Sequence, residues 1–196
     1  MSIFSISILS LILYILTKPT CSYFNNNSNN SNNSNNMDEI VPGLWIGNMV
    51  AANDLHSLKK NNIKYIFNIS RDIPNFYEIS KNFKYYNFQV DDSLLIKDID
   101  LMTQNLAILV NELDTRLRKK NGSILVHCYA GRQRSAIVVA AYLVFKYNMT
   151  PEDACQYILT RRPEAFHYNT SINFKDSLQK YYLLINKKNT YKKRKI

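Results

Sequence analysis

Cysteine, glycine and proline are scarce in this chain, whose 196 residues include 3 Cys, 4 Gly and 5 Pro. So little glycine and proline excludes a collagen-like chain. The three cysteines, Cys21, Cys128 and Cys155, are too few and too widely spaced for a disulfide framework or a zinc site. A content of 46% hydrophobic and 20% charged residues also excludes a wholly disordered chain. The length favours one domain, with or without tails.

Positive charge is concentrated at the carboxyl end. Lys and Arg number 25 against 15 Asp and Glu, and six of the ten net charges lie between Lys187 and Lys195. The rest of the chain is only mildly basic, so composition alone does not indicate a nucleic-acid-binding protein. We expect residues 187–196 to form a solvated basic tail. Nuclear targeting, or binding to nucleic acid or anionic lipid, stays open as the alternative role of this tail.

The amino-terminal part differs from the rest of the chain. Residues 1–24 form an apolar leader, and its first part, residues 1–17, carries no charged side chain. This run is short for a membrane span, and it lacks the leading basic residue and the cleavage site of a signal peptide. It is either a weak anchor or signal that contacts a membrane, or a dispensable segment. Residues 25–36 are only Asn and Ser, a linker with nothing to bury. This leaves residues 37–186 as the folded domain.

Short apolar strands alternate with amphipathic helices in this domain. The strands are expected at Leu44–Ile46, Tyr65–Ile69, Tyr85–Val90 and Ser123–Val126. Helices are expected at Ile99–Arg118, at Ser135–Tyr147 and at about Ser171–Ile185. A further helix is expected to begin at Pro151, with Thr150 as its cap. Residues 135–147 are apolar nearly all round, which predicts a buried helix. The alternation predicts an α/β fold with a central, mostly parallel sheet flanked by helices.

The segment from His127 to Ser135 joins the end of a buried strand to the start of a buried helix. Backbone N–H groups in such a turn, together with the helix N-terminus, bind a phosphate dianion and favour the thiolate of Cys128. Arg134 returns over the same cavity and offers a planar fork to two phosphoryl oxygens. Gly131 allows the backbone to approach the ligand closely.

The other residues of this turn have lesser expected roles. Ser135 donates a hydrogen bond to the sulfur, and His127 orients the loop rather than acting as a base. Arg132 adds a cation beside the pocket. Gln133 either positions the hydrolytic water or faces solvent. Tyr129 and Ala130 complete the phosphate-binding loop.

The pattern His-Cys-x₅-Arg-Ser in this context resembles the motif of the cysteine-based protein tyrosine phosphatase superfamily. Residues 41–48 and 61–69 are also similar to the first strand and the following helix-to-strand step of the dual-specificity phosphatases, and the resemblance covers about residues 37–182. It implies their α/β fold and a general acid on a loop before the cysteine. Asp92 fits that role, with Asp91 as the alternative. The insertion that lengthens the gap to Cys128 is expected at residues 94–98.

The resemblance implies a protein phosphatase that hydrolyses phosphotyrosine and phosphoserine or phosphothreonine through a cysteinyl-phosphate intermediate. It implies no metal or other cofactor, and phosphorylated proteins as partners. The alternatives are a phosphatase of RNA 5′ ends or phosphoinositides with the same mechanism, and a non-catalytic phosphate-binding pseudophosphatase. A thiolate is best kept in a reducing compartment, which favours the cytoplasm or nucleus over membrane tethering. The sequence does not indicate the oligomeric state.

Three further expectations concern the carboxyl-terminal third of the domain. Cys155 is expected in the core, with a role as a resolving thiol as the alternative. Arg161 and Arg162 are expected to be exposed to solvent, where they could meet an acidic substrate. Phe174 and Leu178 resemble the last core pair of the family.

Overall fold

The computed structural model describes residues 35–93, 95–166 and 174–193, and their side chains as far as residue 187. The apolar leader and nearly all of the Asn/Ser linker lie outside the described residues. So do residues 171–173, where the last helix is predicted to begin, and residues 194–196 of the basic tail. In the part that is described, no helix has both the length and the apolar character needed to cross a membrane.

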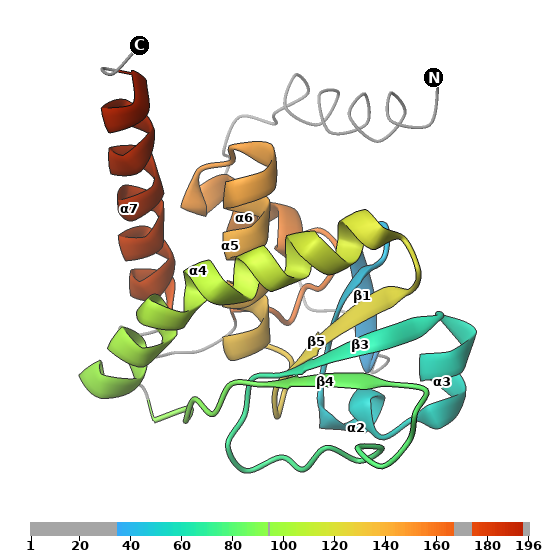
Figure 1. Ribbon diagram of the computed structural model, residues 1–196. Coiled ribbons are helices and arrows are strands. Elements are labelled where there is room, and N and C mark those ends of the chain that lie inside the picture. Colours follow the sequence, from blue (N-terminus) through green and yellow to red (C-terminus); the bar gives the residue numbers. More distant parts are fainter. Residues whose placement is uncertain (1–34, 94, 167–173, 194–196) are drawn as a thin grey trace, which may run out of the picture. The chain divides into compact units, whose positions relative to one another are not determined.

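A five-stranded sheet lies at the centre of the described region (Figure 1). Four strands run parallel, and the edge strand β1 pairs antiparallel with β2, which confirms the predicted mostly parallel sheet. Gly47 and Asn68 both pair with His127, so the carboxyl ends of the three inner strands meet at one edge of the sheet. In spatial order the strands are β1 (Met37–Val41), β2 (Leu44–Gly47), β5 (Ser123–His127), β3 (Ile63–Asn68) and β4 (Lys84–Asn87).

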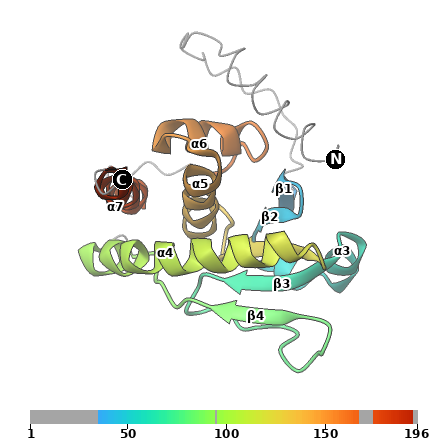
Figure 2. The ribbon, with the colours of Figure 1, turned by 45° about the horizontal axis from the view of Figure 1, so that its top comes forward.

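Helices pack on both faces of the sheet (Figures 1 and 2). On one face, α4 (Ile96–Lys119) and α5 (Arg134–Tyr147) contact β5, and α6 (Pro151–Leu159) and α7 (Lys175–Lys193) pack against α5. The short helices α2 (Met49–Ala52) and α3 (Leu55–Lys60) supply Ala52 and Leu58 to a cluster with Leu125. Because side chains alternate along a strand, the neighbours of Leu125 point to the other face, toward α4 and α5.

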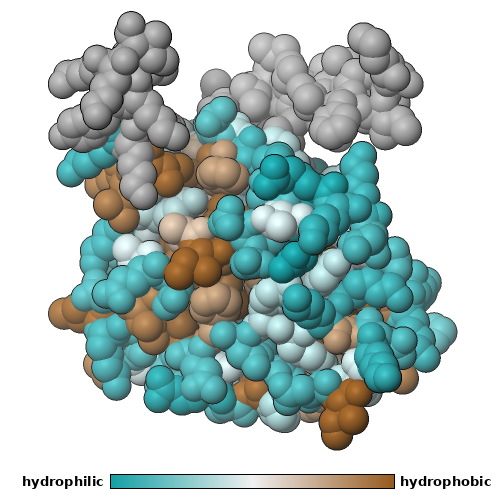
Figure 3. Space-filling view, in the orientation of Figure 1, coloured by the Kyte–Doolittle hydropathy of each residue, from teal (hydrophilic) through white to brown (hydrophobic). Residues whose placement is uncertain are grey.

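Helix α5 is the centre of the helical layer. Every residue from Arg134 to Val144 is buried, as its nearly uniform apolar sequence predicts. Thr150 caps α6 by accepting a hydrogen bond from the backbone N–H of Asp153 at 3.1 Å. Phe174 and Leu178 are fully buried, and they join α7 to this core as predicted. On the face drawn in Figure 3, apolar residues gather where α4, α5 and α7 meet, and hydrophilic residues cover most of the remainder.

Most predicted boundaries differ from the structure by one or two residues, and the larger differences are in β4, α4 and α7. Strand β4 ends at Asn87 rather than Val90, because the chain leaves the sheet there and the Val90 carbonyl turns toward Arg134. Helix α4 begins at Ile96 rather than Ile99, since Ser93 donates a hydrogen bond to the buried Asp98 carboxylate across its first turn. The predicted insertion at residues 94–98 therefore includes the start of this helix. Helix α7 continues beyond Ile185 to Lys193, within the predicted tail.

Candidate active site

Cys128 lies directly after β5, at the sheet edge where the inner strands end. Its side chain is buried, and its Sγ lies 3.4 Å from the Oγ of Ser135 in the first turn of α5. The structure thus brings the predicted nucleophile and its predicted hydrogen-bond donor together. Residues 128–133 form the loop that joins β5 to α5, and these six residues with Arg134 and Ser135 are called the phosphate loop below.

The carbonyl groups of the phosphate loop are bonded from outside the loop. The Tyr129 carbonyl accepts from the backbone N–H of Met49 at 3.1 Å. The Arg132 carbonyl accepts from the backbone N–H of Phe166 at 2.9 Å. A trans peptide directs its C=O and the next residue's N–H to opposite sides. The N–H groups that follow these carbonyls therefore face away from the surrounding protein, as anion binding requires.

Gly131 is required by the close approach of this loop to strand β2. Its φ is +66°, which favours glycine, and a Cβ on it would lie 2.6 Å from the Gly47 carbonyl oxygen. A side chain at this position would push the loop away from the sheet.

Arg134 is buried at the start of α5 and meets the segments that follow two other strands. One terminal nitrogen, Nη1, donates to the Val90 carbonyl at 2.9 Å and lies 3.8 Å from the Asp72 carboxylate. The other, Nη2, lies 3.5 Å from the Asp92 carboxylate. The guanidinium is thus oriented by its neighbours, and its Nε–H has no partner in the described part of the chain.

The two adjacent candidates for the general acid have different surroundings. The Asp91 carboxylate pairs with the Arg71 guanidinium at 3.3 Å, and both side chains lie at the rim. The Asp92 carboxylate instead faces Arg134. Burial raises the pKa of Asp92, the negative charge of Asp72 raises it further, and Arg134 opposes both. Of the two, Asp92 has the surroundings expected of a proton donor.

The remaining loop residues divide into buried and exposed groups. His127, the last residue of β5, is fully buried, and its ring lies against the backbone of Cys128. Its role in orienting the loop stays a prediction. Burial lowers the pKa of His127 to about 4, which keeps the ring neutral. Gln133 is buried as well, so it does not face solvent. Tyr129 and Arg132 are exposed, and Ala130 is partly buried.

Two residues near the phosphate loop were not recognised in the sequence. Asp72 follows β3 at the same sheet edge as Cys128, and its place three residues after a predicted strand is the signal that could have indicated it. Arg162 was expected in solvent, but its side chain is 1% exposed, and its Nε donates to the Gly131 carbonyl at 2.8 Å. The sequence carries no local signal for this contact, because Arg162 and Gly131 lie 31 positions apart.

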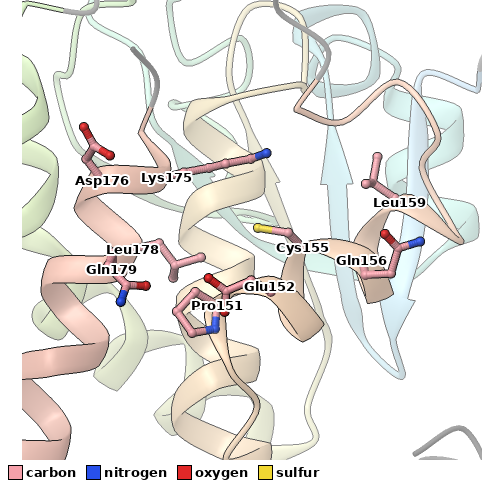
Figure 4. A pocket seen from close by; sticks show the side chains of 9 residues that line it. All are labelled: Pro151, Glu152, Cys155, Gln156, Leu159, Lys175, Asp176, Leu178 and Gln179. Atoms are coloured by element: carbon pink, nitrogen blue, oxygen red, sulfur yellow. The ribbon is translucent and has the colours of Figure 1, made fainter. Parts of the chain in front are cut away.

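A separate cavity of about 450 Å³ lies between α6 and α7 (Figure 4). Cys155 lines it together with Glu152, Lys175 and Leu178. Burial raises the pKa of the Cys155 thiol to about 11, so this sulfur stays protonated at neutral pH. Cys155 is buried, as predicted for a core residue.

Comparison with known proteins identifies the family to which this arrangement belongs. Residues 44–183 match the family described as dual specificity phosphatase, catalytic domain. The chain belongs to the dual-specificity phosphatase family. Dual specificity protein phosphatase Mpk3 of Drosophila melanogaster is 33% identical over 134 residues, which are 66% of this chain and 31% of that protein. Human dual specificity protein phosphatase 6 is 33% identical over 139 residues, 69% of this chain and 33% of that protein. The chain thus spans about a third of the length of these relatives.

Solved structures of this family show the same fold. A mouse putative dual specificity phosphatase complexed with zinc tungstate has a TM-score of 0.69 and 27% identity, and the match covers 84% of this chain and 97% of that one. Human DUSP28 has a TM-score of 0.67 and 25% identity, and covers 78% of this chain and 96% of its own. The predicted fold and family are confirmed.

Proposed function

We propose that this chain is a protein phosphatase that hydrolyses phosphotyrosine and phosphoserine or phosphothreonine through a cysteinyl-phosphate intermediate. The observation that carries the proposal is the convergence of Cys128, Arg134 and Asp92 at one edge of the sheet, with Ser135 3.4 Å from the sulfur. This arrangement provides a nucleophile, a cation for phosphoryl oxygens and a proton donor in one site.

In the first step, the Cys128 thiolate attacks phosphorus. An S–P bond forms, and the P–O bond to the substrate side chain breaks. The loop N–H groups and the Arg134 guanidinium stabilise the charge on the equatorial oxygens. Asp92 gives its proton to the leaving oxygen, and its raised pKa favours the protonated form that this step needs.

In the second step, water releases the phosphate. The Asp92 carboxylate takes a proton from the water, whose oxygen attacks phosphorus while the S–P bond breaks. The Ser135 hydroxyl donates to the departing sulfur, which leaves as a thiolate. Inorganic phosphate is released, and the enzyme returns to its starting state. The Gln133 amide is buried and has no hydrogen-bond partner among the described residues, so it is the group proposed to position this water.

The residues around the opening of the site support the proposed range of substrates. Residues 70–74 follow β3 where tyrosine-specific relatives carry a phosphotyrosine-recognition loop. Asp72 in this segment is 67% exposed beside Arg134. A short polar rim fits phosphorylated serine and threonine as well as tyrosine. Phosphorylated proteins in a reducing compartment, the cytoplasm or nucleus, are the proposed partners, and the basic tail is proposed to contribute contacts to nucleic acid or anionic lipid.

The proposed activity is tested by steady-state hydrolysis of a generic aryl phosphate and of phosphopeptides carrying each of the three phosphorylated residues. A 5′-triphosphorylated RNA and a phosphoinositide serve as the competing substrates. Cys128→Ser should abolish turnover, and Cys155→Ser should retain it, since Cys155 lies in a different cavity. Full turnover by Cys128→Ser would refute the covalent mechanism, and a preference for RNA or lipid would reassign the substrate class.

A further inference from the structure

Arg162 is a buried arginine behind the phosphate loop. Its side chain is 1% exposed, and each of its three nitrogens has a partner. Nε donates to the Gly131 carbonyl at 2.8 Å. Nη1 donates to the Asp38 carboxylate at 2.6 Å and to the Asn35 carbonyl at 3.2 Å. Nη2 lies 3.1 Å from the Glu164 carboxylate. Two carboxylates therefore hold the guanidinium in addition to the loop carbonyl.

The contact with Gly131 controls the direction of a peptide group. The Gly131 carbonyl and the Arg132 N–H belong to the same planar trans peptide and point in opposite directions. When Arg162 holds the carbonyl on the outer side of the loop, the Arg132 N–H is held on the inner side. The neighbouring carbonyls of Tyr129 and Arg132 are held in the same way, but by backbone N–H donors.

Of these three outer donors, Arg162 is the one that is a side chain. Gly131 has the conformational freedom to let its peptide rotate, because it has no Cβ and already has a positive φ of +66°. The peptide that follows the glycine, where the backbone is least restricted by side-chain sterics, is thus the one that a charged side chain fixes. Charge-assisted hydrogen bonds are about twice as strong as neutral ones, which suits this task.

We propose that Arg162 is a positioning residue for the phosphate loop, whose Nε–H holds the Gly131 carbonyl outward and so keeps the Arg132 N–H directed at the bound phosphoryl group. The proposal rests on the proposed function, because it takes this loop as the phosphate site. Asp38 and Glu164 orient the guanidinium for this contact. Residues 35–38, at the start of the domain, are in this way joined to the active site.

The test compares Arg162→Lys with Arg161→Lys. Lysine at 162 keeps a positive charge for Asp38 and Glu164 but lacks the planar fork that bonds three partners at once. Arg161 is the matched control, since its guanidinium is exposed, stacks 3.8 Å from the Tyr157 ring centroid and bonds to Thr160. Tungstate, a tetrahedral dianion, is the probe, and calorimetry gives its dissociation constant without any turnover. Thermal unfolding reports the stability of each variant.

We expect Arg162→Lys to bind tungstate about tenfold more weakly and to lose kcat in parallel, while Arg161→Lys matches the wild type. A purely structural role would lower the unfolding temperature and the folded fraction but not the affinity of each folded molecule. Wild-type affinity in folded Arg162→Lys, or an equal loss in both variants, would overturn the proposal. If Arg162→Lys does not fold, Asp38→Asn must still weaken tungstate binding, and unchanged binding there would overturn it as well. A wild-type protein that binds tungstate but hydrolyses no phosphopeptide would refute the proposed function and leave this test intact.

Discussion

Replacing Asp92 with asparagine removes a proton donor while keeping the size of the side chain. The structure supplies a matched control, because the adjacent Asp91 pairs with Arg71 at the rim and does not face Arg134. If Asp92 is the general acid, Asp92→Asn loses the proton for the leaving oxygen, and Asp91→Asn loses only a partly exposed ion pair. Exposed ion pairs contribute about 0–1 kcal/mol to stability and nothing to proton transfer.

The expected loss for Asp92→Asn is about 10²–10⁴-fold in kcat, the usual contribution of a positioned general acid. This corresponds to about 3–5 kcal/mol of activation free energy. The loss should be largest for serine and threonine phosphates, whose alkoxide leaving groups need the proton most. It should be smallest for an activated aryl phosphate. For Asp91→Asn, kcat should stay within about threefold of the wild type, which is the effect of less than 1 kcal/mol.

The pKa of Asp92 determines the pH dependence and the expected stability. Burial raises this pKa, so the wild-type enzyme keeps its donor to a higher pH than an ordinary aspartic acid would, and activity falls as pH rises through the raised value. Asp92→Asn should lack this fall on the alkaline side. A raised pKa also means that the folded protein disfavours the carboxylate, a stability loss that appears as pH rises. Asp92→Asn should therefore unfold at the same temperature as the wild type, or higher, at neutral pH.

The assay is steady-state hydrolysis of phosphopeptides and an aryl phosphate across a range of pH, with thermal unfolding of the same preparations. Equal losses in Asp91→Asn and Asp92→Asn would show that neither acts alone as the acid. A larger loss in Asp91→Asn would reassign the role. An alkaline decline that persists in Asp92→Asn would attribute that limb of the profile to another group.

Three more changes are expected from the structure. Asp72→Asn removes a negative charge that raises the pKa of Asp92, so the fall of kcat/KM on the alkaline side should move to lower pH. A fall at the same pH as in the wild type would contradict this coupling between Asp72 and Asp92. Burial lowers the pKa of His127 from 6.5 to about 4, so the unfolded chain takes up a proton before the folded one as pH drops. The free energy of unfolding should therefore fall by up to about 3 kcal/mol between these two pH values. Denaturant unfolding of His127→Gln should show a flatter dependence of stability on pH. Phe174→Ala should cost about 3–5 kcal/mol in the same assay, because Phe174, directly before α7, is fully buried, and a loss under 1 kcal/mol would argue against that packing.

The parts of the fold that could be predicted are those whose cause is local. The β5 strand, its turn and α5 follow from an apolar run, a glycine and a second apolar run, all within residues 123–147. Helix α6 follows from its Thr150 cap and first-turn proline. These features depend on neighbouring residues, so a single sequence contains the information needed to place them.

Boundaries set by tertiary contacts could not be predicted in the same way. Strand β4 ends early because the Val90 carbonyl accepts a hydrogen bond from Arg134, which lies 44 positions later. Strand β1 was not predicted, because its residues 37–41 become a strand only by pairing with β2. Asn36 lies in the polar linker by composition, yet its carbonyl accepts from the Asn48 N–H at 3.0 Å. The acceptor is a backbone carbonyl, which every residue has, so the composition of the linker gives no signal for this bond.

The residues that carry the chemistry of the phosphate loop and the residues that hold its shape come from different parts of the chain. The nucleophile Cys128 and the phosphate-binding Arg134 lie six positions apart and form a recognisable motif. The donors that hold the loop carbonyls outward come from Met49, Arg162 and Phe166, which lie in segments before and after it. Because those carbonyls and the inner N–H groups are linked by rigid peptide planes, oxyanion binding depends on the folded domain as a whole. A chain with this motif could therefore lose phosphate binding through a single substitution far from it, and the motif alone would not reveal the loss.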